Sequence, residues 1–167
     1  IRSIYEGRIR NWNEVGGPDR PIVVIDKERH RGTRHVFMNY IFGDPQARAP
    51  GVRLVTGSNN EEQAKVAQSD SAIGMLSFAW MNRDVRGLAI TVGNQNIEPT
   101  QANVESGVYP IARNLNLIVD EAANRDVRAF VDFLLSDQGQ AVVRTSQYIP
   151  IRPSEGSHLA SDLSRHP

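Results

Sequence analysis

Short apolar runs alternate along the chain with segments whose apolar residues recur at helical spacing. Runs of about four to eight residues bounded by Gly, Pro or polar positions are typical of β-strands. The sequence predicts strands at Ile22–Ile25, Val52–Thr56, Ala72–Leu76, Leu88–Val92 and Leu115–Val119. The first run is apolar at every position, which indicates a strand buried on both faces of a parallel sheet.

Helical periodicity appears between these runs and again near the end of the chain. Val36, Phe37, Tyr40 and Ile41 share one face of a predicted helix over 33–42. The segment Ser58-Asn59-Asn60-Glu61 fits a capping box, which predicts a helix over 59–68. Further helical segments are predicted within Ile1–Arg10, from Thr100 to near Gly107, over Val127–Leu135 and over Asp137–Arg144.

The segment Pro21–Val36 combines a strand, a basic loop and a Gly-Thr pair that opens a helix. In α/β proteins this order builds an anion site, because the first helical N–H groups lack backbone partners and the helix dipole favours negative charge there. Four cationic residues add to this field against two acidic ones, Asp26 and Glu28. The cations are Lys27, Arg29, Arg31 and Arg34. The alternative interpretation is a solvated, charged turn.

Composition removes several classes of function. The 167 residues contain 19 basic and 19 acidic side chains, so net charge gives no reason to expect nucleic-acid or membrane binding. The absence of Cys excludes disulfides and thiolate metal sites. No apolar run approaches the ~20 residues of a membrane span. No signal peptide is evident and the first residue is not Met, so we expect a processed chain or a fragment.

Catalytic and metal chemistry find little support in the sequence. The four histidines show no metal-ligand spacing, and we predict neither a metal nor another cofactor. Asp132 and Asp137 are interpreted as solvent-facing charges rather than a general acid–base pair. No serine lies in a G-x-S-x-G turn. We therefore do not expect an enzyme.

Several motifs, taken in order, resemble those of one family. The segment Ile4–Gly17 is similar to the Y-x-G-K-I-x-N-W-x-E-V-G-G stretch of phosphate-binding proteins of the ABC phosphate-specific transport system. Gly32-Thr33-Arg34-x-x-Phe37 resembles the G-S-G-T-R-x-x-F anion loop of that family. Further similar landmarks are Gly57–Asn59, Ala72–Gly74, Pro99-Thr100, Gly107–Arg113, Phe130–Gln140 and Tyr148–Pro150.

The resemblance implies an α/β fold of the type II periplasmic-binding-protein class, with a mostly parallel sheet flanked by helices. Two lobes in that family hold phosphate in the cleft between them. By resemblance, residues 1–110 are the second, anion-loop lobe and residues 111–153 are a returning strand and helices of the first lobe. Residues 154–167 are expected to be a polar tail. The N-terminal part of the first lobe is expected to be missing.

The resemblance also implies ligand contacts, and the anion loop departs from the family pattern Arg-x-x-Gly-Ser-Gly-Thr. Lys27 stands in place of the Arg and loses its bidentate fork. His30 replaces the first Gly and Arg31 replaces the Ser. The candidate contacts are Lys27, Arg31, Gly32 and Thr33, flanked by Arg34, together with Ser58 and Asn59. Ser58 has the alternative role of a plain helix cap.

These residues predict a solute-binding component of an ABC uptake system for inorganic phosphate or a similar oxyanion, present as a partial protein. The implied partners are that anion and, for the full-length protein, a transporter permease. The resemblance also implies a periplasmic or cell-surface location for the protein. The unpaired segment 111–153 also predicts a homodimer. The alternatives are a degenerate interaction module without phosphate affinity, favoured by His30-Arg31, and an oxyanion-dependent enzyme, which would need a general base near the loop.

Overall fold

The computed structural model describes residues 1–151, and the predicted tail 154–167 lies outside the described residues. The chain divides into two compact units, one from Ile1 to Asn116 and one that begins at Leu117. The assignment of residues 1–110 and 111–153 to different lobes of a larger protein stays a prediction. Within the described part of the chain, no helix combines the length and apolar character needed to cross a membrane.

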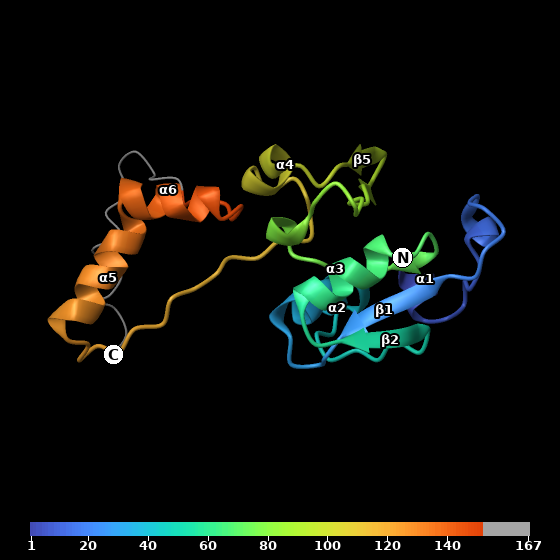
Figure 1. The fold of residues 1–167 in the computed structure, drawn as a ribbon, viewed down its shortest axis with the longest axis horizontal. Helices are drawn as coiled ribbons and strands as arrows, with labels where there is room; N and C mark the ends of the chain where they lie inside the picture. The colour runs from blue at the N-terminus through green and yellow to red at the C-terminus, as the bar shows by residue number, and fades with distance from the viewer. Residues whose placement is uncertain (152–167) are drawn as a thin grey trace. The chain divides into compact units, whose positions relative to one another are not determined.

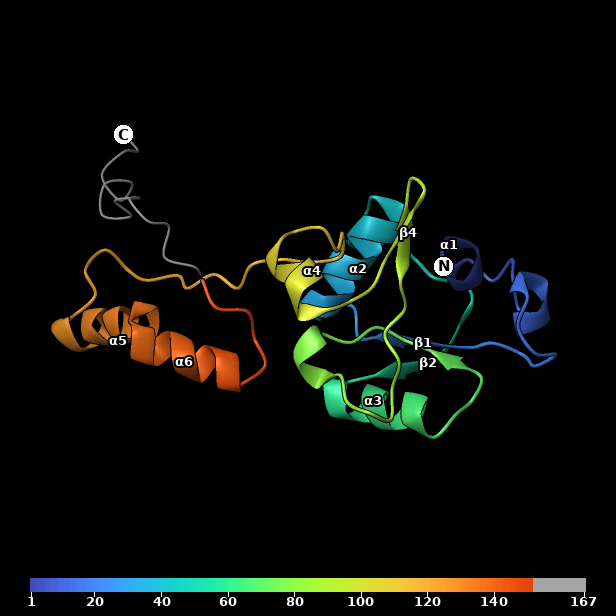
Figure 2. The ribbon, with the colours of Figure 1, turned by 90° about the horizontal axis from the view of Figure 1, so that it is seen from above.

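Three parallel strands form the main sheet of the first unit. They are β1 (Val23–Lys27), β2 (Val52–Thr56) and β3 (Ala72–Ile73), in the spatial order β2-β1-β3. Parallel neighbours require crossover connections, which α2 (Gly32–Phe42) and α3 (Asn59–Ala67) supply. These two helices cover opposite faces of the sheet (Figure 2). The predicted α/β class with a parallel sheet flanked by helices is confirmed.

The apolar core lies between β1, α2 and the short N-terminal helix α1 (Arg2–Tyr5). Tyr5 and Met38 are completely buried, and the ring of Tyr5 lies 4.9 Å from that of Phe37. Ile22 and Val24 belong to the same cluster. Most members of the cluster come from the predicted first strand and from α2, so these two segments form the centre of the core.

The strand predicted at Leu88–Val92 was wrong in its extent. Only β4 (Ile90–Val92) forms, and it pairs antiparallel with β5 (Gln95–Ile97) in a separate hairpin. Gly93 adopts a positive φ of 60° in the two-residue turn between them. Glycine suits such a turn, so a short local hairpin forms in place of the longer predicted strand.

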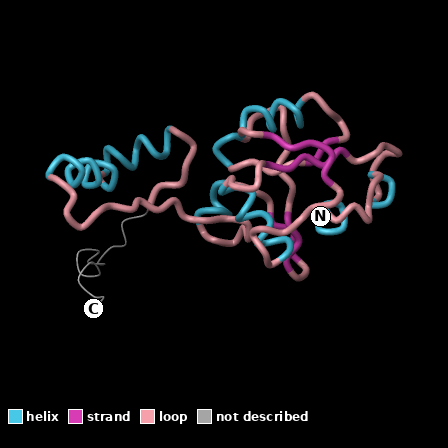
Figure 3. Tube along the Cα trace, turned by 90° about the horizontal axis from the view of Figure 1, so that it is seen from below, coloured by secondary structure: helices cyan, strands magenta, loops and turns pink. Residues whose placement is uncertain are grey.

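The strand predicted at Leu115–Val119 was also wrong. Among the described residues this segment pairs with no other strand, and Figure 3 draws the chain between α4 (Gln101–Glu105) and α5 (Arg125–Leu135) as loop. Its side chains are open to solvent, with Ile118 97% exposed. An apolar run becomes a strand only where a neighbouring backbone offers hydrogen-bonding partners, and the described chain offers none here.

The second unit contains the two helices α5 (Arg125–Leu135) and α6 (Asp137–Thr145), shown in orange in Figure 1. Asn124 caps α5 by accepting from Val127 N–H, and Ser136 caps α6 by accepting from Gly139 N–H. A side chain at position 139 would collide with the carbonyl oxygen of Phe133, so the glycine allows the two helices to meet. The first unit also has the 3-10 turns η1 (Trp12–Val15) and η2 (Phe78–Trp80).

Candidate anion site

Two helix N-termini follow the carboxyl ends of neighbouring strands. The chain passes from Lys27, the last residue of β1, through a four-residue loop to Gly32, the first residue of α2. It passes likewise from Thr56 at the end of β2 to α3, which Ser58 caps. In open α/β sheets ligands bind at this edge, beyond the carboxyl ends of the strands. The predicted site residues therefore share one edge of the sheet.

The α2 terminus presents free hydrogen-bond donors. Arg31 is the N-cap residue, and its side chain does not cap the helix. Among the described residues, no acceptor is bonded to the backbone N–H groups of Gly32, Thr33 or Arg34. Gly32 and Thr33 are partly exposed, so these donors are open to a ligand. Unsatisfied amides at the positive end of a helix dipole favour an anion.

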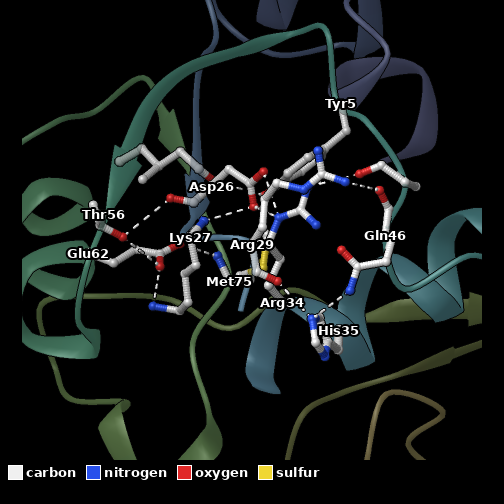
Figure 4. A network of polar contacts seen from close by, with 12 residues as sticks. Tyr5, Asp26, Lys27, Arg29, Arg34, His35, Gln46, Thr56, Glu62 and Met75 are labelled. Carbon is white, nitrogen blue, oxygen red and sulfur yellow. Dashed lines mark hydrogen bonds and ion pairs between the residues drawn. The ribbon is translucent and has the colours of Figure 1, made fainter. Parts of the chain in front are cut away.

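The guanidinium of Arg34 points into the interior of the first unit and away from the loop. Its Nε lies 3.0 Å from both carboxylate oxygens of Asp26, and its Nη2 donates to the carbonyl oxygen of Ala47 at 2.9 Å (Figure 4). Arg34 is 3% exposed and Asp26 is 6% exposed. The pair ties the first turn of α2 to β1, so the side chain of Arg34 serves structure and leaves only its N–H for a ligand.

Lys27 is also turned inward, where its ammonium forms an ion pair with Glu62 of α3 (Figure 4). The Lys27 side chain is 2% exposed and that of Glu62 is fully buried. Burial raises the pKa of the Glu62 carboxyl, and the hydrogen bonds from Lys27 and the N–H of Met75 oppose that rise. Direct contact between Lys27 and an anion in the loop would require Glu62 to release the ammonium.

Glu62 connects all three parallel strands. Besides Lys27 of β1, it accepts a hydrogen bond of 3.3 Å from the hydroxyl of Thr56 in β2 and one of 2.6 Å from the N–H of Met75, just after β3. Gly74 leaves room for the carboxylate, since a Cβ there would lie 2.5 Å from Glu62 Oε1. The interior carboxylate therefore joins the strands at the edge that carries the anion loop.

The remaining charges of the loop face solvent. Nε and Nη2 of Arg31 each lie 3.2 Å from Oε2 of Glu28, and Nε2 of His30 lies 3.6 Å from the same oxygen. Arg29 donates from Nη2 to the carbonyl oxygen of Gln46 at 3.2 Å. The side chains of Arg31 and Glu28 are each 44% exposed, so this pair is open to competition from a ligand.

The second predicted cluster, Ser58 and Asn59, lies at the α3 terminus. The hydroxyl of Ser58 accepts from Glu61 N–H at 3.1 Å, while Glu61 Oε2 accepts from Gly57 N–H at 2.9 Å. The predicted Ser58 cap is confirmed, but the predicted capping box is incomplete, because the Glu61 carboxylate accepts from the N–H of Gly57 and not from that of Ser58. Ser58 keeps its hydroxyl proton available as a donor, and Asn59 is partly exposed in the first turn.

Comparison with known protein families and curated proteins identifies the relatives of this chain. Residues 1–138 match the model of the PBP superfamily domain. The chain belongs to the PBP superfamily. Among curated proteins, it is 30% identical over 153 residues to the phosphate-binding protein PstS of Bacillus subtilis (strain 168), covering 90% of this chain and 49% of that protein. It is 29% identical over 161 residues to PstS of Borreliella burgdorferi, covering 91% and 57%.

Solved structures give the same relationship. A putative phosphate ABC transporter substrate-binding protein with bound phosphate, from Clostridium perfringens, matches with a TM-score of 0.77 and 32% identity, covering 91% of this chain and 61% of that one. An ABC-type phosphate transport receptor from Vibrio cholerae matches with a TM-score of 0.68 and 27% identity, covering 90% and 61%. The predicted resemblance to phosphate-binding proteins of ABC transport systems is confirmed. This PBP superfamily chain spans about half the length of the curated relatives it matches.

The sequence did not reveal which cations of the first unit are neutralised by buried carboxylates. Asp26 and Arg34 are 8 positions apart, and Lys27 and Glu62 are 35 positions apart. No local sequence pattern predicts either pair. The inward position of Glu62 on α3 was the only available clue, since it shares a helical face with Val66. Within residues 1–151, no cluster of three His, Cys, Asp or Glu side chains could hold a metal ion.

Proposed function

We propose that this chain supplies the anion-binding lobe of a solute-binding component of an ABC uptake system for phosphate or a related oxyanion. The free N–H groups at the start of α2 carry the proposal. They lie at the carboxyl edge of a parallel sheet, in a chain whose solved relative from Clostridium perfringens holds phosphate. The wider assignment extends to the transporter permease as a partner, a position outside the cytoplasm and a non-enzymatic role.

The contacts fall into two groups under this proposal. Gly32 and Thr33 donate backbone N–H groups, Thr33 also donates its hydroxyl, and Arg31 supplies an exposed positive charge after exchanging Glu28 for the anion. Lys27 and Arg34 hold the ends of the loop through their buried partners. Ser58 and Asn59 form a second, weaker donor group at the α3 terminus.

A second candidate is an interaction module that has lost phosphate affinity. The observation that favours it is the neutralisation of Lys27 by Glu62, of Arg34 by Asp26 and of Arg31 by Glu28. A loop whose cations are already paired attracts an added anion less strongly, because the ligand must displace a carboxylate or share the field with it.

Titration of the ¹⁵N-labelled chain with phosphate, sulfate and molybdate separates the candidates. We expect phosphate to shift the N–H resonances of Gly32 and Thr33, with weak affinity for the chain alone, because an anion that is wet on one side gains less from charge and hydrogen bonding. Affinity should fall with salt and in Arg31→Ala, since exposed charges are screened over about 8–10 Å at ordinary ionic strength. Lys65→Ala is the matched control, because Lys65 lies in the last turn of α3, away from its N-terminus.

Two results would contradict the proposal or its details. Unchanged resonances for Gly32 and Thr33 at tens of millimolar phosphate would support the interaction module. Submicromolar phosphate binding by the chain alone would contradict the expected weak affinity, because it would show that this chain needs no second lobe to bind the anion tightly.

A further inference from the structure

An arginine that the sequence analysis did not count among the contacts lies directly at the α2 terminus. The guanidinium of Arg113 rests on Gly32: a Cβ at position 32 would lie 2.6 Å from Nη2, 3.2 Å from Cζ and 3.5 Å from Nη1 of Arg113. The two residues are 81 positions apart in the sequence. Only the absence of a side chain at position 32 lets the guanidinium lie this close to the first N–H groups of the helix.

The backbone that carries Arg113 is fixed to the first unit by its neighbours. The hydroxyl of Tyr109 donates to the carbonyl oxygen of Leu88 at 3.2 Å, and the N–H of Tyr109 donates to the carbonyl oxygen of Asn103 at 2.8 Å. Ile111 packs against the apolar core. These anchors lie two and four residues before Arg113, so its position over Gly32 follows from contacts within the same unit.

Arg113 differs from Lys27, Arg31 and Arg34 in having no carboxylate partner among the described residues. Within residues 1–151, no hydrogen bond or ion pair engages its guanidinium, whereas Arg31 and Arg34 pair with Glu28 and Asp26. The side chain is exposed, which leaves its donors accessible. Placing a cation against the positive end of a helix dipole is unfavourable unless an anion lies between them.

We infer that Arg113 is an anion-contacting residue that shares a bound oxyanion with the α2 terminus. This inference rests on the proposed function and adds a ligand from outside the anion loop. The guanidinium presents paired N–H donors that fit two oxygens of a tetrahedral oxyanion, and the N–H groups of Gly32 and Thr33 meet the others. An anion at this point relieves the repulsion between the guanidinium and the helix dipole.

The test compares Arg113→Ala, Arg113→Lys and the wild-type full chain by titration with inorganic phosphate, following the N–H resonances of Gly32 and Thr33. We expect Arg113→Ala to weaken phosphate binding roughly three- to ten-fold, and Arg113→Lys to weaken it less, since lysine keeps the charge and loses the fork. Arg53→Ala is the matched control: it also removes an exposed positive charge, near the start of β2, and phosphate affinity should stay within about two-fold.

A double-mutant cycle adds a readout that loss of charge alone does not give. Gly32→Ala keeps Arg113 and displaces its guanidinium from the helix terminus, so it should weaken phosphate binding in the wild type and have a smaller effect in the Arg113→Ala chain. Thermal unfolding of each variant identifies any change caused by altered folding.

The outcomes separate this inference from the proposed function. Wild-type shifts at Gly32 and Thr33 with unchanged affinity in Arg113→Ala would overturn the inference and leave the proposed function standing. No phosphate-induced shifts in the wild type would overturn both. An equal loss of phosphate affinity in Arg53→Ala and Arg113→Ala would show that only net charge matters, and it would overturn the assigned contact.

Discussion

The two units of the chain each contain an 11-residue helix, α2 and α5, but the two helices differ in what covers their apolar side chains. In the first unit, α2 buries Phe37 and Met38 against the sheet and α1. In the second, α5 is strongly amphipathic and well capped, and yet none of its residues is buried. Phe130 is 58% exposed, and in α6 Val142 is 55% exposed.

The polar interior shows the same contrast. The first unit buries two ion pairs, Asp26–Arg34 and Lys27–Glu62, beside its anion loop. Apart from Gly139, the described residues of the second unit bury nothing, and their side-chain hydrogen bonds join groups no more than 11 positions apart. An amphipathic pattern therefore specifies that one helix face needs cover, while the cover itself depends on what the rest of the chain provides.

The largest difference should appear when equivalent aromatic residues are truncated. Phe37→Ala should lower the free energy of unfolding of the first unit by about 3–5 kcal/mol, because it removes a buried ring and leaves a cavity. Phe130→Ala, the matched control, should change it by less than about 0.5 kcal/mol. Chemical denaturation of both full-chain variants, at a concentration where the chain is monomeric, measures this. Similar losses in the two would show that the Phe130 face is covered within a single chain.

Breaking the buried ion pair between Lys27 and Glu62 should cause the next largest loss of stability. Glu62→Ala leaves the ammonium of Lys27 buried without its partner, and we expect a loss of about 3 kcal/mol in the free energy of unfolding. The exposed Asp132→Ala of α5 is the control and should be nearly neutral. A loss under about 1 kcal/mol for Glu62→Ala would mean that Lys27 reaches water readily and is available to a ligand.

The same carboxyl predicts a pH dependence. The folded-state pKa of Glu62 is raised, so its stabilising contribution is complete below the unfolded pKa and is lost as pH rises through the folded value. The difference in the free energy of unfolding between wild type and Glu62→Gln should therefore fall as the pH rises through and above the ordinary range of a glutamate carboxyl. Denaturation at several pH values checks this sign, and a rising difference would contradict the raised pKa.

Self-association of the full chain is a second test of whether the exposed apolar face of α5 needs cover. We expect a homodimer at micromolar concentration, with residues 111–153 at the contact, since uncovered apolar surface favours pairing with a second copy. Phe130→Glu should shift the mass measured by light scattering toward the monomer, while Val55→Glu, an exposed position on β2, should not. A strictly monomeric mass for the wild-type chain would contradict the predicted homodimer.

The smallest expected effect concerns the helix caps. Ser58→Ala should lower the free energy of unfolding of the first unit by about 1 kcal/mol, because Glu61 N–H loses its acceptor. In the second unit, Ser136→Ala should appear mainly as reduced helix content by circular dichroism, since α6 has little tertiary packing to hold it. Equal loss of helix content in both variants would remove the distinction between the units.

Predictions of single elements were closest where the controlling contacts are local. The helix over 59–68 was confirmed within one residue, and Ser58 caps it as expected, because a cap joins atoms only three residues apart. Val52–Thr56 was confirmed as a strand without any change of bounds. The Gly93-Asn94 turn was a local signal that the sequence analysis overlooked, and it explains the error at Leu88–Val92.

The position of the candidate site was predicted from the sequence, but the ion pairs that neutralise its cations were not. Strand, loop and the Gly32-Thr33 helix start lie where the pattern indicated, because each is defined within about ten residues. The burial of Lys27 was not foreseen, since its partner Glu62 approaches only after β2 and α3 have folded against β1. Arg113 was quoted as part of a motif and not as a contact, because its approach to Gly32 depends on the whole first unit.

The sequence by itself determined the α/β class, the helix starts and the donor-rich turn before α2, because periodicity, caps and turn residues act over a few positions. The tertiary structure alone decided which carboxylates neutralise Lys27 and Arg34, and that Arg113 lies on Gly32. It also decided that Leu115–Val119 forms no strand, since hydrogen bonds between strands, like ion pairs, need a partner brought from elsewhere in the chain.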